Sequence, residues 1–251
     1  MNASLRRTTG ASRPVKILLL HGLGGRPATW DRFVDQVADP AEVWVAELPW
    51  HSQATTEWAW PADQPSVLAD LLADNDFDAV VAHSFAASLL IEAYASGAVA
   101  QRPTVLVGAC YRPRPEDFDW ATISRYLNGF HRIFGEALRV DDTGRYPEKY
   151  REWMAVYLRD QIGPYGWMRW FESYLRSPFL DLSGVTAPVL VTAGDGDIAA
   201  PPTDGHALAA ALPNGRFVQL ADCGHFPMLE KPELMAQLVG DFLTHHCLEL
   251  T

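Results

Sequence analysis

The chain has 251 residues, of which 48% are hydrophobic, so it can bury the core of one large domain or of a domain with an insert. Its formal net charge is −11 and no lysine or arginine run offsets it, which argues against nucleic acid and anionic membrane surfaces as partners. We therefore expect a small, largely apolar substrate, bound by a monomer or a homodimer.

The three cysteines, Cys110, Cys223 and Cys247, are odd in number and unrelated in spacing. This pattern argues against a disulfide framework and against a zinc site of the CxxC type. The apolar stretch at 15–20 is followed at once by HGLGG, so it has neither a cleavage pattern nor the length needed to cross a bilayer. These features predict a soluble, cytoplasmic protein with reduced thiols.

Short apolar runs alternate with helical patterns along the first half of the chain. Helical spacing is seen for Trp30, Phe33, Val34 and Val37, and again for Val67, Leu68, Leu71 and Leu72. The runs between them are nearly continuous in aliphatic residues, as in strands buried on both faces: VKILLL (15–20), EVWVAEL (42–48), DAVVAH (78–83) and PTVLVGA (103–109). The alternation predicts a parallel sheet with helices on both faces.

The alternation stops after Cys110. Residues 111–182 contain no comparable strand but hold three apolar and aromatic stripes at helical spacing, within 123–134, 150–158 and 167–174. Strands return at PVLVTAG (188–194) and GRFVQLAD (215–222), and a closing helix is marked by Leu234, Met235, Leu238, Val239 and Phe242. We expect residues 1–110 and 183–251 to form the core domain and 111–182 to form a helical insert.

Ser84 interrupts the apolar stretch VVAHSFAASLL (80–90) where a predicted strand turns into a predicted helix. A sharp strand-to-helix turn can present one side chain at its apex and demands small residues two before and two after it, here Ala82 and Ala86. Ser84 is therefore either a nucleophile at such an elbow or an ordinary helix N-cap.

A serine hydroxyl needs a nearby base, which is itself oriented by an acid, before it becomes a good nucleophile. Two later strands end in residues of these types. The strand 188–194 is followed by Asp195 and Asp197, and the strand 215–222 is followed by His225.

With these residues in place, the chain resembles the α/β-hydrolase family. The motifs that carry the resemblance occur in family order over nearly the whole chain: LLLHGLGG (18–25), ELPWHS (47–52), AHSFA (82–86), AGDGD (193–197) and DCGHFPMLEKPE (222–233). The resemblance implies a mostly parallel, doubly wound sheet with a helical cap, 111–182, inserted after the sixth strand of the family fold.

The resemblance also implies roles for individual residues. Ser84 would be the nucleophile, His225 the general base and then acid, and Asp197 the residue that orients His225. Asp197 is preferred to Asp195 because family members place the acid three residues after the glycine that closes the strand. Asp195 and Asp204, like Asp222, are expected to be loop carboxylates or helix caps.

An oxyanion hole needs two backbone N–H groups directed at the developing charge. By resemblance these come from Leu23 and Phe85, and the adjacent Gly22 lets the backbone approach the substrate. Trp50 follows a strand at the carboxyl edge of the sheet, where ligands bind in open α/β folds, and is predicted to line the pocket. Trp153 is the predicted substrate contact from the insert, although its aromatic stripe could equally fasten the insert to the core.

The remaining histidines suggest no further chemistry. His21 is expected to brace a loop, and His83 to point away from the apex by strand alternation. The others lack partners at metal spacing, so neither a metal site nor a cofactor is predicted.

The hypothesis drawn from these patterns is a capped serine hydrolase that cleaves a carboxylic ester, thioester or lactone with a bulky apolar acyl or aromatic group through an acyl-enzyme. Two alternatives stay open. The same scaffold could cleave a C–C or amide bond, or act as a cofactor-free lyase or cyclase with His225 as base. It could also serve as a hydrolase-like receptor for a small ligand.

Overall fold

The computed structural model describes residues 2–8, 14–38, 40–51, 56–60, 65–73, 75–141 and 145–248. Ser52, the last residue of the 47–52 motif, lies outside the described residues. Within the described ranges, no helix is both long enough and apolar enough to cross a membrane.

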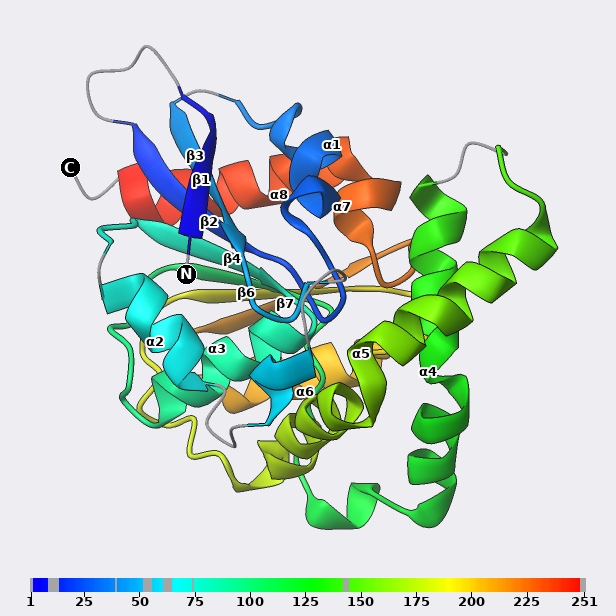
Figure 1. The fold of residues 1–251 in the computed structure, drawn as a ribbon. Helices are drawn as coiled ribbons and strands as arrows, with labels where there is room; N and C mark the ends of the chain where they lie inside the picture. Colours follow the sequence, from blue (N-terminus) through cyan, green and yellow to red (C-terminus); the bar gives the residue numbers. More distant parts are fainter. Residues whose placement is uncertain are drawn as a thin grey trace.

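A single seven-stranded sheet forms the centre of the molecule (Figure 1), with strand order β1-β3-β2-β4-β5-β6-β7. Only the edge pair β1 and β3 is antiparallel, and every other neighbouring pair is parallel. The strands are β1 (Asn2–Arg7), β2 (Val15–Leu20), β3 (Ala41–Glu47), β4 (Ala79–His83), β5 (Thr104–Val107), β6 (Val189–Gly194) and β7 (Gly215–Leu220). The predicted parallel sheet is thus confirmed.

The N-terminal strand β1 was not predicted. Its sequence, NASLRR, contains a single large apolar residue, Leu5, which is 43% exposed. A strand at the edge of a sheet is stabilised mainly by backbone hydrogen bonds to one neighbour, so it needs no apolar run. The hydrophobic pattern that reveals the buried strands is therefore missing from β1.

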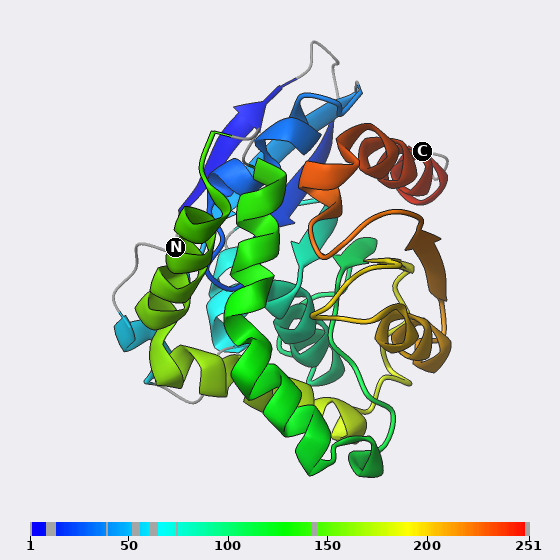
Figure 2. The same cartoon turned by 90° about the vertical axis from the view of Figure 1, so that its right-hand side faces the viewer.

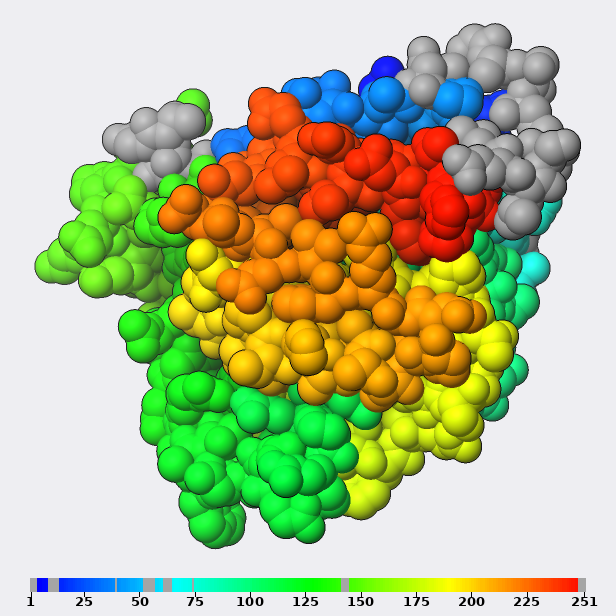
Figure 3. Space-filling model, turned by 180° about the vertical axis from the view of Figure 1, so that it is seen from behind, coloured from blue at the N-terminus to red at the C-terminus, as the bar shows by residue number. Residues whose placement is uncertain are grey.

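Helices cover both faces of the sheet, as predicted. One face packs against α1 and α8, with Trp30 and Phe33 fully buried there; the other packs against α2, α3 and α6. Figure 3 shows the C-terminal part of the chain, coloured yellow to red, forming one continuous surface on this side of the molecule. The helices of this part are η1 (Pro27–Trp30), α1 (Asp31–Val34), η2 (Thr56–Ala59), α2 (Pro65–Ala73), α3 (Phe85–Ala95), α6 (Pro202–Ala211), α7 (Pro227–Glu230), α8 (Pro232–Leu243) and η5 (Thr244–Leu248).

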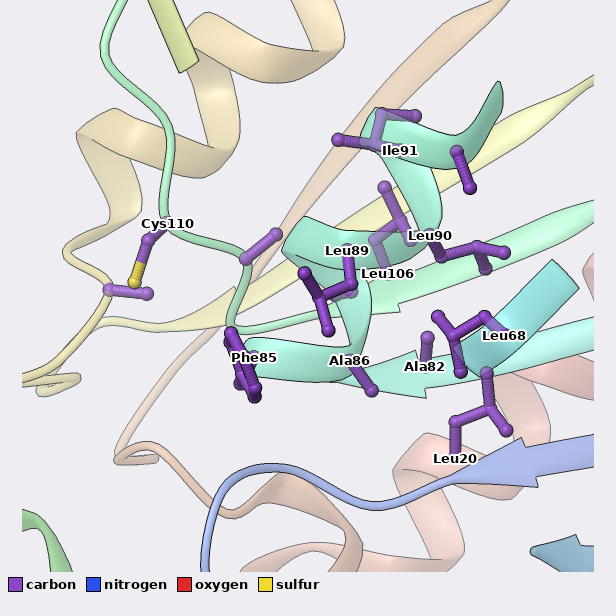
Figure 4. Close-up of a cluster of buried hydrophobic side chains, with 14 of the residues drawn as sticks. Leu20, Leu68, Ala82, Phe85, Ala86, Leu89, Leu90, Ile91, Leu106 and Cys110 are labelled. Atoms are coloured by element: carbon purple, nitrogen blue, oxygen red, sulfur yellow. The ribbon is translucent and has the colours of Figure 1, made fainter. Parts of the chain in front are cut away.

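Helix α3 is buried along most of its length, which fixes its first turn relative to the sheet. Figure 4 shows Leu89 and Leu90 of α3 among side chains from the neighbouring elements, including Leu20 of β2, Leu68 of α2 and Leu106 of β5. All of these side chains are fully buried. At about 25 cal/mol per Å² of apolar area, such burial holds α3 firmly on the sheet.

The segment 111–182 follows β5 and contains two long helices, α4 (Trp120–Asp141) and α5 (Glu148–Arg176), with the short helices η3 (Pro115–Asp117) and η4 (Ser177–Phe179). The three predicted stripes thus lie on two helices, which pack against each other (Figure 2). Helix α5 is interrupted at Gly163, where φ is 69° and ψ is 173°, and Pro164 follows. Since proline cannot donate to the preceding turn, the chain breaks and restarts the helix there.

A buried polar cluster ties α5 to the core. The Tyr174 hydroxyl donates to the carboxylate of Asp204 on α6 and accepts from Arg112 Nε at 2.7 Å. Arg112 Nε also lies 3.2 Å from Asp204 Oδ1. Burial raises the pKa of Asp204 to about 6, because its contacts only partly replace the lost water. This cluster positions Asp204 as a structural anchor between the helical segment and the sheet domain.

Replacing Tyr174 with phenylalanine should destabilise the protein by about 1–3 kcal/mol, because the buried carboxylate of Asp204 loses a donor. Urea unfolding followed by circular dichroism measures the change in the free energy of unfolding. The matched control is Tyr165→Phe, at a 58% exposed tyrosine of the same helix, which should unfold like the parent. Equal stability of the two variants would contradict the role given to the cluster.

Candidate active site

Ser84 lies at a strained turn between β4 and α3. Its backbone has φ 54° and ψ −119°, a left-handed conformation that a residue with a Cβ adopts only at a cost of about 1–3 kcal/mol. Its N–H donates to Val107 O on the neighbouring strand β5 at 2.8 Å. Although Ser84 occupies the N-cap position of α3, its side chain makes no capping hydrogen bond. The strained backbone of Ser84 therefore does not provide a capping hydrogen bond for α3.

The hydroxyl of Ser84 instead joins a chain of hydrogen bonds with the two predicted partners. Ser84 Oγ lies 2.9 Å from His225 Nε2, and His225 Nδ1 lies 2.8 Å from Asp197 Oδ2. Asp197 Oδ1 accepts two further bonds, from the N–H groups of Ala199 and Ala200, both at 2.8 Å. Because a carboxylate can only accept, Nδ1 carries the imidazole proton and Nε2 is free to take the proton of Ser84.

The charge around His225 favours its protonated form. Burial alone lowers the pKa of His225, but the adjacent Asp197 carboxylate, with smaller contributions from Glu136 and Glu230, more than reverses this effect. The resulting pKa lies above the ordinary value for histidine. The imidazole is thus a stronger base than one in water, as the removal of a hydroxyl proton requires.

Two glycines allow the backbone to pass close to these side chains. A Cβ on Gly22 would lie 2.9 Å from Ser84 Cβ. Gly108, just after β5, has φ 58°, and its Cβ would lie 2.9 Å from His225 Cε1 and 3.2 Å from Asp197 Oδ2. Any side chain at either position would displace the hydrogen-bonded chain.

Phe85 follows Ser84 directly in the chain, and Leu23 lines the same cavity as Ser84. Phe85 is the first residue of α3, so its N–H has no acceptor within the helix. In the loop after β2, the N–H groups of Gly24 and Gly25 donate to backbone carbonyls, whereas that of Leu23 makes no backbone hydrogen bond among the described residues. Two such donors are what a tetrahedral oxyanion needs.

A cavity of about 780 Å³ opens above Ser84, between the core and the two long helices. Its inner wall is mostly apolar, while its lining also includes Arg26 and Asp31. The lining from α4 and α5 comprises Phe130, Ile133, Phe134, Ala137, Leu138, Met154, Tyr157, Leu158, Gln161 and Trp170, and the core contributes Gly22, Leu23, His83, Ser84, Ala199, His225, Phe226 and Leu229, among others.

The structure does not bring the predicted contacts Trp50 and Trp153 to this cavity. Trp50 is fully buried beneath it, where its indole N–H donates to His21 O and its ring packs 5.1 Å from that of Phe85. Trp153 is 57% exposed and does not line the cavity, although its ring stacks on that of Tyr157, which does. Gly22, by contrast, does line the cavity.

His21 and His83, which lie within two of the quoted motifs, form hydrogen bonds with backbone groups. His21 Nδ1 donates to Gly22 O at 2.9 Å and Nε2 accepts from Leu48 N–H, and burial lowers the pKa of His21 to about 4. His21 therefore braces a loop, as expected. His83 was expected to point away from the apex, yet its ring lies 4.7 Å from that of His225, and its Nε2 donates to His225 O at 2.8 Å.

Two glutamates that were not predicted hold the loop that carries His225. Glu136, from α4, accepts from the His225 N–H at 2.8 Å. Glu230 accepts from the N–H groups of Gly224 and Phe226. Glu230 lies within the quoted motif DCGHFPMLEKPE (222–233), whereas Glu136 lies in none of the quoted motifs. No signal in the sequence relates Glu136 to a loop that lies 89 residues away.

Asp195 and Asp204, which were predicted to have no catalytic role, form hydrogen bonds that connect parts of the structure. Asp195 accepts from the N–H groups of Asp222 and Cys223, and so holds together the two loops that carry Asp197 and His225. Asp204 belongs to the buried cluster with Tyr174. Across the described ranges, no group of three or more His, Cys, Asp or Glu side chains is arranged to hold a metal ion.

Comparison with known proteins places this architecture in a family. The model of the alpha/beta hydrolase family matches residues 17–238. A pimeloyl-[acyl-carrier protein] methyl ester esterase of Aromatoleum aromaticum is 26% identical over 90% of this chain and 96% of its own length. A Mycobacterium tuberculosis protein, BpoC, which bears the name of a non-heme bromoperoxidase, is 47% identical, but only over 20% of this chain and 19% of its own length.

A solved structure of similar shape is the enol-lactonase of Burkholderia xenovorans, with a TM-score of 0.60, 21% identity and 96% of each chain covered. At this identity the likeness shows the fold alone. The family model, in contrast, covers most of the sequence, from within β2 to within α8. The chain therefore belongs to the alpha/beta hydrolase family.

Proposed function

We propose that the protein is a serine hydrolase that cleaves a carboxylic ester, thioester or lactone with a bulky apolar acyl or aromatic group. The observation that carries the proposal is the hydrogen-bonded chain from Ser84 Oγ through His225 to Asp197. It supplies a nucleophile, a base and an orienting acid at hydrogen-bonding distance, at the foot of the cavity.

The reaction would proceed in two stages. Ser84 Oγ attacks the carbonyl carbon while His225 Nε2 takes its proton, and the N–H groups of Leu23 and Phe85 stabilise the oxyanion. The protonated His225 then gives this proton to the departing alcohol or thiol, which leaves an acyl-enzyme. Water, deprotonated by the same nitrogen, attacks the ester on Ser84, and His225 passes this proton to Ser84 Oγ as the acyl–oxygen bond breaks and the acid is released. Asp197 stabilises the imidazolium in both stages.

The choice of an apolar acyl group rests on the cavity. Its wall from α4 and α5 is made by side chains such as Ile133, Leu138 and Leu158, which cannot hydrogen-bond a polar substrate. The relative named as a methyl ester esterase supports carboxylic ester chemistry. The cavity volume suits a ligand of moderate size.

Replacement of Ser84 by alanine should lower the turnover of p-nitrophenyl esters by about ten-thousand-fold or more, because no other group takes the place of the nucleophile. The rate of p-nitrophenolate release measures the effect. Ser88→Ala, which removes another buried hydroxyl of α3, is the matched control and should retain activity. Retained turnover in Ser84→Ala would place the nucleophile elsewhere.

A covalent adduct distinguishes the proposed reaction from its alternatives. Mass spectrometry of the quenched enzyme should find an acyl group on the peptide that contains Ser84 during turnover. Active turnover without an adduct would favour a lyase or cyclase that uses His225 as base. Ligand-induced stabilisation without repeated turnover would favour a receptor.

The pH dependence of kcat/KM should show an acid limb set by His225, which must be neutral to accept the proton of Ser84. Since Asp197 raises the pKa of His225 above its ordinary value near 6.5, activity should be full at alkaline pH and fall as the pH drops through this raised value. Asp197→Asn should move the limb to lower pH and reduce its plateau. A limb unchanged in this variant would show that another group titrates.

Replacing Leu158 with alanine should reduce the preference of the enzyme for esters of long acyl chains over esters of short ones. Loss of about three buried methylene equivalents, at about 0.8 kcal/mol each, predicts a fall of roughly tenfold or more in kcat/KM for octanoate but little change for acetate. A series of p-nitrophenyl esters of increasing chain length measures this difference. Leu127→Ala, at a leucine of α4 that is 57% exposed, is the control and should leave the series unchanged. Equal profiles for the two variants would exclude α5 as the acyl wall.

A further inference from the structure

The loop that carries His225 is held at its backbone from two sides. From the core, His83 Nε2 donates to His225 O at 2.8 Å. From α4, Glu136 Oε1 accepts from His225 N–H, also at 2.8 Å. The imidazole therefore extends from a backbone whose N–H and carbonyl are both held by side chains: His83 is buried, and Glu136, which belongs to the helical segment 111–182, is half-buried.

The carboxylate of Glu136 is not solvated like that of an ordinary surface glutamate on a helix. Its second oxygen, Oε2, is shielded from solvent and makes no hydrogen bond with any described group. Burial raises the pKa of Glu136, although its bond to the His225 N–H acts in the opposite direction. Burying a carboxylate oxygen without a partner disfavours folding, so the bond to the His225 N–H is the favourable contact that this side chain makes with the loop.

Gly224 provides space for this contact. A Cβ at Gly224 would lie only 1.6 Å from Glu136 Oε1. The other groups that face this part of the loop are Glu230 from α7, Asp197 from the loop after β6, and His83 from β4, while Arg32 of α1 donates to the nearby carbonyls of Leu229 and Val140. The side chain of Glu136 is thus the direct connection from α4 to the backbone of His225.

We propose that Glu136 is a positioning residue that couples the placement of α4 over the cavity to the alignment of His225 with Ser84. The inference rests on the proposed function, since alignment matters only where His225 is the base for Ser84. With α4 in place, Glu136 fixes the N–H of His225 and the imidazole stays within 2.9 Å of Ser84 Oγ. Displacement of α4 releases this hold and weakens the activation of the serine. Closure of the cavity over the substrate and activation of the nucleophile are then one event.

Labelling of Ser84 by a small fluorophosphonate tests this coupling, because the rate of labelling reports the activation of the serine without a need for the natural substrate. Glu136→Ala should label about 10- to 100-fold more slowly, since a misplacement of about 1 Å can cost on the order of 100-fold. Glu136→Gln keeps an oxygen that accepts from His225 N–H and should label within about threefold of the parent. Glu152→Ala, which removes an exposed glutamate of α5, is the matched control.

A shift in pH dependence separates positioning through Glu136 from a merely structural role. Glu136→Gln removes a negative charge that raises the pKa of His225, so the acid limb of labelling should move to lower pH while the plateau is retained. Glu152→Gln should leave the limb in place. An unchanged acid limb in Glu136→Gln together with a parental labelling rate in Glu136→Ala would overturn the proposal.

Gly224→Ala disrupts the same contact from the opposite side. The added methyl group meets the flexible end of Glu136 and should push it off the His225 N–H, so this variant should label as slowly as Glu136→Ala. The double variant should be no slower than Gly224→Ala alone, because the added methyl group already removes the contact that Glu136→Ala deletes. Additive losses, or a parental labelling rate in Glu136→Ala, would overturn the proposal. If Glu136→Ala lacks a cooperative thermal transition, Gly224→Ala and Glu136→Gln decide the question.

The outcomes keep this inference apart from the proposed function. Turnover by Ser84→Ala would refute the proposed function whatever Glu136 does. An inactive Ser84→Ala together with parental rates in Glu136→Ala would refute only the coupling.

Discussion

The strained backbone at Ser84 is the constraint on which the rest of the site depends. A serine with a positive φ is unfavourable by about 1–3 kcal/mol, and the packing of α3 against the sheet must offset this strain. Once Ser84 projects from the end of β4, the neighbouring chain segments can approach it only as glycine, at Gly22 after β2 and at Gly108 after β5. The loops after β6 and β7 then bring Asp197 and His225 to the same edge. The geometry of the candidate site follows from where parallel strands end.

Much of this arrangement could be predicted from the sequence, for a physical reason. Strands buried on both faces must be almost wholly apolar, so each one is visible in isolation, and a polar residue directly after such a strand stands out. Ser84 and His225 stand out in this way, whereas the strand pattern offers both Asp195 and Asp197 and the resemblance to the α/β-hydrolase family decides between them. The structure brings Ser84, His225 and Asp197 within hydrogen-bonding distance. The sequence did not reveal β1, because an edge strand with a solvated face carries no such pattern.

Several contacts that the sequence could not predict come from the helical segment. Periodicity identifies the faces of α5 but does not say which side chains reach the cavity, so Trp153 was expected there although it is 57% exposed and absent from the lining. Its neighbours Met154 and Leu158, on the inner face, line the cavity instead. Glu136 carries even less information, since a glutamate in a polar helix is unremarkable until the tertiary structure places it against His225. Such contacts depend on the docking of helices rather than on local patterns.

The interruption at Gly163 divides α5 into two helical halves that make different contacts. The second half contacts the core through Tyr174, which belongs to the buried cluster with Asp204. It also contacts the core through Arg176, whose Nε lies 3.0 Å from Oε1 of Glu92 in α3. The first half of α5 contributes Met154, Tyr157 and Leu158 to the cavity wall, and the second half contributes Trp170. Because the helix is broken at Gly163, the first half can change its angle to the sheet without carrying the contacts of Tyr174 and Arg176 along a continuous helix.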